Sequence, residues 1–178
     1  MQLLQPYQPH WKEDFRRISM VLADALLPLQ LQAEHVGSTA VPGLAAKPII
    51  DIDIVLDNGK DLGEVITKLE LAGYYHNGDQ GIPGREVFKR SGRQPLHPVL
   101  DVVAHHLYVC PPDSAELQRH LAFRDYLIAN EEARHRYEDL KQELAAEAGQ
   151  DRKIYAALKE IRAAGFIQEI LERTGCVS

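Results

Sequence analysis

The sequence IIDIDIVL at positions 49–56 is the feature that most restricts what this chain can fold into. Its apolar content predicts a β-strand, and the alternation of side chains along a strand separates two faces. Asp51 and Asp53 project from one face. The other face carries residues that can enter a core, namely Ile50, Ile52, Ile54 and Leu56. Two adjacent carboxylates repel each other, so a basic side chain, solvent or a divalent cation has to offset their charge.

Gly37 and Ser38 form a second motif, directly after a short strand predicted over 31–36. A turn there can offer backbone N–H groups and a hydroxyl to the oxygens of a phosphate. Taken singly, Gly37 and Ser38 also fit a plain turn, and Asp51 and Asp53 also fit a solvated strand face without a metal. Because only twelve residues separate Ser38 from Asp51, we expect both acids to face one solvent-accessible cleft with Gly37 and Ser38 at its edge.

The spacing of apolar and turn residues predicts the remaining elements. Helices are predicted over 10–29, 61–72, 114–129, 131–147 and 151–173. Asp113, with Glu116 three residues later, is typical of a capping box at the start of the 114–129 helix. The segment 76–98 is rich in glycine and proline around a strand predicted at 86–89. We expect this segment to be a mobile, substrate-facing loop.

The β-rich stretch VLDVVAHHLYVC at 99–110 predicts a further strand, which ends at Pro111-Pro112. Within it, Asp101 has apolar neighbours, and strict alternation places His105 on the same face. His106 then falls on the opposite face unless a bulge intervenes. Histidine can act as a base or a metal ligand near neutral pH, although one or both could equally be strand residues with satisfied hydrogen bonds.

Length and composition limit the class of protein. A chain of 178 residues with 45% hydrophobic and 26% charged residues is ordinary for one globular domain, and we expect a single domain over 1–178. Its sheet core is expected over about 10–112 and its C-terminal helices over about 113–175. The formal net charge of −6 argues against a nucleic-acid partner, because a polyanion is repelled.

Two cysteines without CxxC spacing predict neither a disulfide framework nor a structural zinc site, and a reducing cytoplasm fits best. No apolar run approaches the length of a membrane span, and the N-terminal sequence does not resemble a signal peptide. We therefore expect a cytoplasmic protein without a membrane partner. The sequence leaves the oligomeric state open.

A resemblance to a known family rests on longer strings of residues. Gly-Ser followed about a dozen residues later by an acid-hydrophobic-acid strand resembles the signature of the nucleotidyltransferase superfamily. The string HVGSTAVPGLAAKPIIDIDI at 35–54, followed by HHLYV, FRDYL and two Tyr-x-x-x-Lys segments, resembles the GrpB-like family over nearly the whole chain. The resemblance implies an α+β fold, with a nucleotidyltransferase-like mixed β-sheet flanked by helices and extended by C-terminal helices.

The same resemblance implies a metal site for Mg²⁺ or Mn²⁺ at Asp51 and Asp53, and a phosphate site at Gly37, Ser38 and Thr39. Active members of the superfamily usually add a third carboxylate on a neighbouring strand. Asp101 is one candidate for it. Because the family match centres on the His105-His106 pair, a histidine could replace this acid, and both histidines are candidate catalytic residues together with the two aspartates.

Several basic side chains could neutralise a bound phosphate. Lys47 directly precedes the acidic strand, and Arg124 lies in the FRDYL string, although an exposed loop lysine and an arginine-aspartate packing pair are the plainer interpretations. The two Tyr-x-x-x-Lys segments place each tyrosine and lysine on one helical face. Their residues, which could otherwise be parts of solvated helix faces, are Tyr137, Lys141, Tyr155 and Lys159.

Three functional hypotheses follow. The first is the metal-dependent transfer of a nucleoside monophosphate unit from a nucleoside triphosphate to an unknown acceptor. The second is a non-catalytic nucleotide- or cofactor-binding accessory domain, since the family resemblance extends to a domain fused to some dephospho-CoA kinases. The third is a metal-dependent phosphoesterase built on Asp51, Asp53 and His106.

Overall fold

The structure is a computed structural model that describes residues 2–29, 31–57, 61–94 and 96–176. Its strands are β1 (Gln32–Val36), β2 (Ile50–Val55), β3 (Tyr74–His76), β4 (Glu86–Arg90) and β5 (His105–Cys110). The short 3-10 helix η1 (Ser38–Ala40) follows β1. The α-helices are α1 (His10–Ala25), α2 (Leu62–Leu71), α3 (Ala115–Ala129), α4 (Glu131–Glu147), α5 (Arg152–Arg162) and α6 (Ala164–Arg173). This mixed arrangement is the predicted α+β class.

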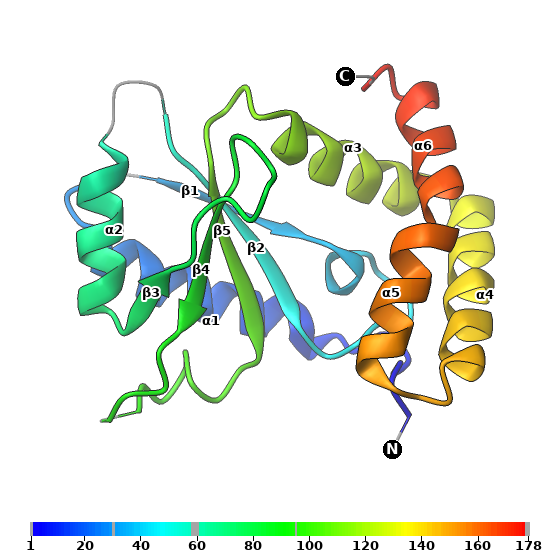
Figure 1. Cartoon of the computed structure of the whole chain (residues 1–178), viewed down its shortest axis with the longest axis horizontal. Helices are drawn as coiled ribbons and strands as arrows, with labels where there is room; N and C mark the ends of the chain where they lie inside the picture. The colour runs from blue at the N-terminus through cyan, green and yellow to red at the C-terminus, as the bar shows by residue number, and fades with distance from the viewer. Residues whose placement is uncertain (1, 30, 58–60, 95, 177–178) are drawn as a thin grey trace.

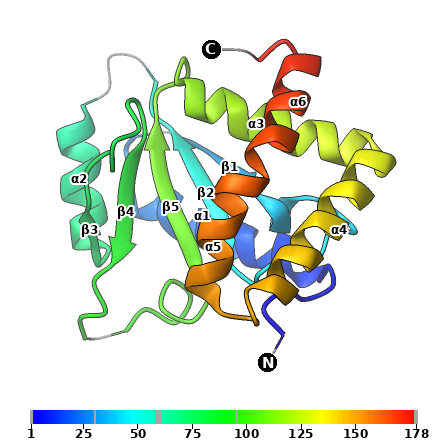
Figure 2. The same ribbon diagram turned by 45° about the vertical axis from the view of Figure 1, so that its right-hand side comes forward.

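The five strands form one sheet in the order β1-β2-β5-β4-β3. Strands β2 and β5 are parallel, and the other neighbouring pairs are antiparallel. In Figure 1, α1 lies behind the sheet, α2 stands at the left, and α3 to α6 gather at the right. Figure 2 shows the same C-terminal helices brought forward beside β2 and β5. The centre of the sheet is thus the parallel β2–β5 pair.

One face of the sheet is apolar and is covered by α1 and α2. The buried cluster on this side combines side chains of both helices with those of the central strands: Trp11, Ile18, Leu22, Ile50, Ile52, Ile54, Val65, Leu69, Leu107 and Val109. The alternation predicted for 49–56 is therefore confirmed. It leaves Asp51 and Asp53 on the opposite face of β2, beside His106 and Tyr108 of β5 in the strand register.

The C-terminal helices pack on the loop that follows β1 rather than on the sheet alone. Val41 and Leu44 of this loop share a buried cluster with side chains of α3, α4 and α6, among them Leu127, Tyr137 and Ile170. A further cluster joins Leu4 to Leu144 and Tyr155 of α4 and α5. The C-terminal helices are thereby held over the polar face of the sheet.

Side-chain caps fix where several helices begin. Asp61, Asn130 and Asp151 each accept a hydrogen bond from a backbone N–H in the first turn of α2, α4 and α5. The cap of α3 is Ser114, whose Oγ accepts from Leu117 N, so the capping box predicted from Asp113 is wrong. The helix predicted over 151–173 is interrupted at Ala163, which separates α5 from α6.

The strand predicted over 99–110 begins only at His105. Residues 99–103 form a turn in which Val102 N and Val103 N both donate to Val99 O. The ring nitrogen Nδ1 of His97 accepts from the N–H groups of Val99 and Leu100, which offers the backbone an alternative to a β-ladder. The β-rich composition of this stretch is overridden by these local hydrogen bonds.

The segment 76–98 contains β4, which confirms the strand predicted at 86–89. Its Pro95 lies outside the described residues. A short strand that the sequence did not indicate, β3, precedes it and pairs with β4. Within the described residues, no helix is long and apolar enough to cross a membrane.

Candidate functional site

A pocket of about 390 Å³ lies between the polar face of the sheet, the turn after β1 and the C-terminal helices. Its lining brings together nine of the residues predicted from the sequence: Gly37, Ser38, Thr39, Lys47, Asp51, His106, Lys141, Tyr155 and Lys159. Its other polar lining side chains, absent from the sequence prediction, include Tyr108, Glu116, Arg119 and His120. The lining described contains no residue of the 76–98 segment, which was expected to face the substrate.

Asp51 stands on β2 with 30% of its side chain exposed, and its Oδ1 lies 2.8 Å from Nδ1 of His106. The strand register places these two residues opposite each other on β2 and β5. Gly37 approaches the same carboxylate from the turn after β1. A Cβ atom at Gly37 would lie 2.3 Å from Asp51 Oδ2. The turn can therefore approach the acidic strand only because position 37 has no side chain.

Hydrogen bonds of Thr39 also hold the turn after β1 in place. Thr39 is buried, and its hydroxyl donates to the backbone oxygen of Ile49, 3.3 Å away. The Nε2 atom of His35 lies 3.0 Å from the same hydroxyl oxygen. Burial lowers the pKa of His35 to about 4, so this ring is neutral near pH 7. Thr39 therefore links the turn to the start of β2 instead of presenting its hydroxyl freely to a ligand.

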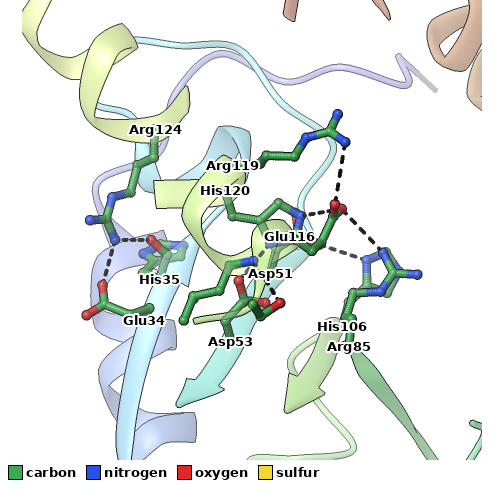
Figure 3. Close-up of polar contacts among 12 residues, drawn as sticks. Glu34, His35, Asp51, Asp53, Arg85, His106, Glu116, Arg119, His120 and Arg124 are labelled. Carbon is green, nitrogen blue, oxygen red and sulfur yellow. Dashed lines mark hydrogen bonds and ion pairs between the residues drawn. The ribbon is translucent and has the colours of Figure 1, made fainter. Parts of the chain in front are cut away.

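Asp53 lies on the same face as Asp51 but is fully buried. Its Oδ2 atom is 2.7 Å from Nδ1 of His120, on α3. Its Oδ1 atom is buried without a hydrogen-bond partner within the described part of the chain. The expectation that both acids face the solvent-accessible cleft thus holds for Asp51 and is wrong for Asp53, because His120 covers it (Figure 3).

His120 bridges two carboxylates. Its Nε2 atom lies 3.2 Å from Oε1 of Glu116, one turn earlier on α3. Burial lowers the pKa of His120, but the hydrogen bonds to Asp53 and Glu116 outweigh burial and raise the pKa to about 9. The hydrogen bond between Glu116 and His120 also lowers the pKa of Glu116. An imidazolium is therefore held between two carboxylates at neutral pH.

Arginines surround Glu116 as well. Arg85 and Arg119 approach its carboxylate at 3.7 and 3.8 Å. Figure 3 shows Glu116 between these two arginines. Glu116 and His120 were not predicted as site residues. Their spacing of four residues was visible, but one sequence does not show which face of α3 meets the sheet. Glu116 reaches the acidic strand only through His120, which lies between it and Asp53.

Four predicted site residues lie outside the pocket lining, namely the buried Asp53 and the three residues Asp101, His105 and Arg124. Asp101 sits in the 99–103 turn, where both of its carboxylate oxygens bind the Arg90 guanidinium at 2.7 and 2.8 Å. Arg90 holds the pKa of Asp101 low, at about 2. Because the strand starts after this turn, alternation does not extend back to Asp101, and the proposed pairing of Asp101 with the acidic strand is wrong.

His105 points away from His106. Its Nε2 atom lies 2.6 Å from the Tyr74 hydroxyl, and its Nδ1 atom lies 2.7 Å from Val103 O. Burial lowers its pKa. Since His105 and His106 are adjacent on β5, only one of them can share a face with Asp51. That residue is His106, so the expected catalytic placement of His105 is wrong.

Arg124 serves the framework instead of the pocket. Its Nη1 atom lies 2.8 Å from Glu34 Oε2 and 3.0 Å from His35 O on β1, and its Nε atom binds Asp125. It is not part of the pocket lining. The plainer interpretation of a packing interaction therefore fits Arg124, which ties α3 to the edge strand β1.

Three lysines line the pocket together with Asp51. Lys47 lies 5.2 Å from the ring centre of Tyr155. Lys141 is 1% exposed and donates to Ser38 Oγ and to the backbone oxygen of Ala45. Burial and the nearby Lys159 lower its pKa to about 7. The interpretation of the Tyr-x-x-x-Lys segments as solvated helix faces is therefore wrong for the buried Lys141 and Tyr155.

Lys159 of α5 also lines the pocket. The oxygen of Tyr137 raises its pKa, burial opposes this effect, and the charge of Asp51 adds to the rise. The pocket thus has an acidic side, formed by Asp51 with Asp53 behind it, and a basic side formed by Lys47, Lys141 and Lys159. In the described residues no group of three or more His, Cys, Asp or Glu side chains is arranged to hold a metal ion.

Comparison with known proteins assigns the family. A family model described as GrpB protein matches residues 3–173. The chain is 35% identical over 170 residues to a UPF0157 protein of Halalkalibacterium halodurans, a match that covers 96% of this chain and 80% of the relative. The mixed sheet with its C-terminal helical layer is thus a GrpB fold, and the chain belongs to the GrpB family.

A crystal structure of the conserved protein GrpB from Enterococcus faecalis superimposes with a TM-score of 0.76 and 31% identity. The superposition covers 96% of this chain and 98% of that one. A dephospho-CoA kinase of Mycolicibacterium paratuberculosis is 39% identical over 74 residues, which span 40% of this chain and 18% of the kinase. The family resemblance and the fold class expected from the sequence are confirmed.

The contact between Gly37 and Asp51 can be tested by a double-mutant cycle. We expect Gly37→Ala to lower the free energy of unfolding by more than the roughly 1–3 kcal/mol that a side chain costs at this backbone conformation (φ 72°, ψ −172°), because its Cβ also meets the Asp51 carboxylate. In an Asp51→Ala background the same substitution should cost less. Urea unfolding of the four proteins measures the difference.

Gly78→Ala is the matched control, since Gly78 also has a positive φ but a Cβ added there would meet no atom within 4 Å. Gly78→Ala should show the cost of a side chain at a positive φ without a clash like that between a Cβ at Gly37 and Asp51. An equal cost for Gly37→Ala in both backgrounds would contradict the close approach.

The Asp53–His120 pair predicts a pH dependence of stability. The pKa of His120 is about 9 in the folded protein and about 6.5 when unfolded. The folded state therefore holds the proton more tightly, and this stabilisation is complete below about pH 6.5 and is lost as the pH rises through about 9. The stability difference between wild type and His120→Gln should shrink across that interval.

The comparison with His120→Gln is needed because Lys141 acts in the opposite direction. Its pKa is lowered to about 7 in the folded protein, so its effect on stability rises with pH above that value. Both proteins contain Lys141, and its contribution cancels in the difference. Thermal unfolding at pH 6 and at pH 9.5 supplies the values, and a constant difference would argue against a protonated His120.

Proposed function

We propose that this protein binds a nucleoside triphosphate together with Mg²⁺ or Mn²⁺ and transfers its nucleoside monophosphate unit to an acceptor. The single observation that supports this proposal is the meeting of acidic and basic side chains in one pocket. Asp51, with the buried Asp53 near it on β2, and the three lysines meet there beside the Gly37-Ser38 turn. A metal-bound triphosphate is a ligand with the complementary arrangement of charges.

The basic side of the pocket is suited to the phosphate groups. Lys47 and Lys159 line it from the loop before β2 and from α5, and Ser38 adds a hydroxyl. In a chain of net charge −6, gathering several ammonium groups around one cavity is costly without an anion to compensate them. A triphosphate provides that anion, and each charge-assisted contact is worth roughly 1.5–3 kcal/mol.

The acidic side is suited to a hard cation. Asp51 offers a carboxylate at the pocket, and near it on β2 the Oδ1 atom of Asp53 is buried without a partner in the described residues. Magnesium is commonly held by one or two carboxylates together with substrate phosphates, so a site built on two aspartates does not need a third protein ligand. When bound, the metal would neutralise charge on the phosphates during the transfer.

His106 is placed to handle a proton. It is 44% exposed at the pocket, and its Nδ1 atom is held by Asp51 at 2.8 Å. A carboxylate that orients an imidazole leaves the second ring nitrogen free to take a proton from an acceptor hydroxyl. His120 instead keeps Asp53 oriented and buried, from the side of α3. The transfer would then rest mainly on positioning and on charge stabilisation.

A second candidate function is a nucleotide- or cofactor-binding accessory domain without catalysis. The observation that favours it is the similarity to part of a dephospho-CoA kinase. The ion pair that covers Asp53 with His120 is also compatible with a pocket that binds without turnover. The two candidates share the ligand class and differ in whether a bond is broken.

Ligand binding tests the proposed charge pairing. We expect Lys159→Met to weaken the affinity for nucleoside triphosphates by about tenfold or more, since one charge-assisted contact is lost. Asp51→Asn should remove the part of the affinity that depends on magnesium and leave metal-free binding nearly unchanged. Calorimetric titrations with four nucleoside triphosphates, with and without magnesium and at two salt concentrations, give these affinities.

Lys153→Met is the matched control, because Lys153 is an exposed lysine on the same helix, α5, and is outside the pocket lining. It should bind like the wild type. Equal affinities for Lys159→Met and Lys153→Met would refute the phosphate site. Release of pyrophosphate on addition of acceptors would support the transferase, while tight binding without release would favour the accessory domain.

A further inference from the structure

Ser38 and Lys141 form a pair inside the pocket that phosphate binding alone does not explain. The Nζ atom of Lys141 lies 3.3 Å from Oγ of Ser38. Lys141 also donates to the backbone oxygen of Ala45, which fixes the direction of its amine. Ser38 follows directly after Gly37, at a sharp turn between β1 and η1, and lines the pocket. A hydroxyl next to a fixed amine in a cavity is the arrangement of a nucleophile with its base.

The surroundings of Lys141 favour the neutral amine. Its side chain is 1% exposed. The adjacent Glu138 of α4 already accepts a hydrogen bond from Ala45 N. Lys159 faces Lys141 from α5 and disfavours its charge, whereas Glu138 and the Tyr137 ring favour that charge. Because burial outweighs the latter two, the pKa falls to about 7, and a large share of the amine can accept a proton at neutral pH.

We propose that Ser38 is a nucleophile that attacks phosphorus and that Lys141 is its general base. The inference rests on the proposed function for its substrate, a nucleoside triphosphate, and adds a covalent step to it. Oγ of Ser38 would form a bond to the α-phosphorus, the bond from that phosphorus to the pyrophosphate leaving group would break, and the hydroxyl proton would pass to Nζ of Lys141.

The second half of the reaction returns the protein to its starting state. An acceptor hydroxyl attacks the same phosphorus, the bond to Ser38 Oγ breaks, and Lys141 gives its proton back to that oxygen. The acceptor's own proton passes to His106 and from there to solvent. The sum is a nucleoside triphosphate and an acceptor converted to a nucleotidylated acceptor, pyrophosphate and one proton. Lys159 and Lys47 face the charge that develops on the phosphates.

A fluorophosphonate tests this step without any nucleotide, because it offers an activated phosphorus centre with fluoride as leaving group. We expect a covalent adduct on Ser38, located by mass spectrometry of the digested protein. Ser38→Ala should abolish the adduct, and Ser91→Ala, which alters a serine of a distant loop, should not. Lys141→Arg, which keeps a cation but does not readily accept a proton, should slow labelling by about 100-fold or more.

The pH profile of labelling in the wild type covers the case in which Lys141→Arg fails to fold. The rate should rise between about pH 6 and 8 with a midpoint near the Lys141 pKa of about 7. A continuous rise that follows hydroxide, absence of an adduct on Ser38, or equal rates in folded Lys141→Arg would each overturn the proposal. Labelling of Ser38 in a protein that binds no nucleotide would uphold the pair and refute the proposed substrate. Nucleotide binding without labelling of Ser38 would refute the Ser38–Lys141 pair and support the proposed substrate.

Discussion

The close approach of Gly37 to Asp51 is the contact on which the rest of the site depends. Because the glycine has no side chain, the turn after β1 can lie directly against the carboxylate on β2. The loop continues to Val41 and Leu44, which form the seat for the C-terminal helices. The position of α4, and with it of Lys141, therefore depends on a loop that lies far earlier in the chain and is held by this backbone contact.

The parts of the site that the sequence predicted are those governed by local geometry. Alternation along β2 correctly separated the acids from the core, and helical spacing correctly paired each tyrosine with its lysine. Alternation failed where its starting point was unknown. Because β5 begins at His105, the face assigned from Asp101 did not apply to this strand. Hydrogen bonds made by the His97 ring, which no composition reveals, set that boundary.

The parts that the sequence missed depend on how separate elements meet. Glu116 and His120 became site residues because α3 docks over Asp53, and Arg124 left the site because it binds Glu34 on β1. Both outcomes are set by docking of one helix on the sheet, which pattern analysis of a single chain does not supply. Lys141 is a further case: its prediction as a pocket residue rested on helical spacing, but its burial depends on how α4 packs and could not be predicted from that spacing.

The charged groups that line the pocket compensate one another only in part. On the acidic side each aspartate has an imidazole partner, His106 for Asp51 and His120 for Asp53. On the basic side Lys159 disfavours the charge of Lys47, and burial disfavours that of both Lys47 and Lys141. Asp51 also favours the charges of Lys47 and Lys159, so its carboxylate is shared between an imidazole and two ammonium groups. Under the proposed function, a phosphate would offset the burial of the lysines, and a cation would compete with His106 for Asp51.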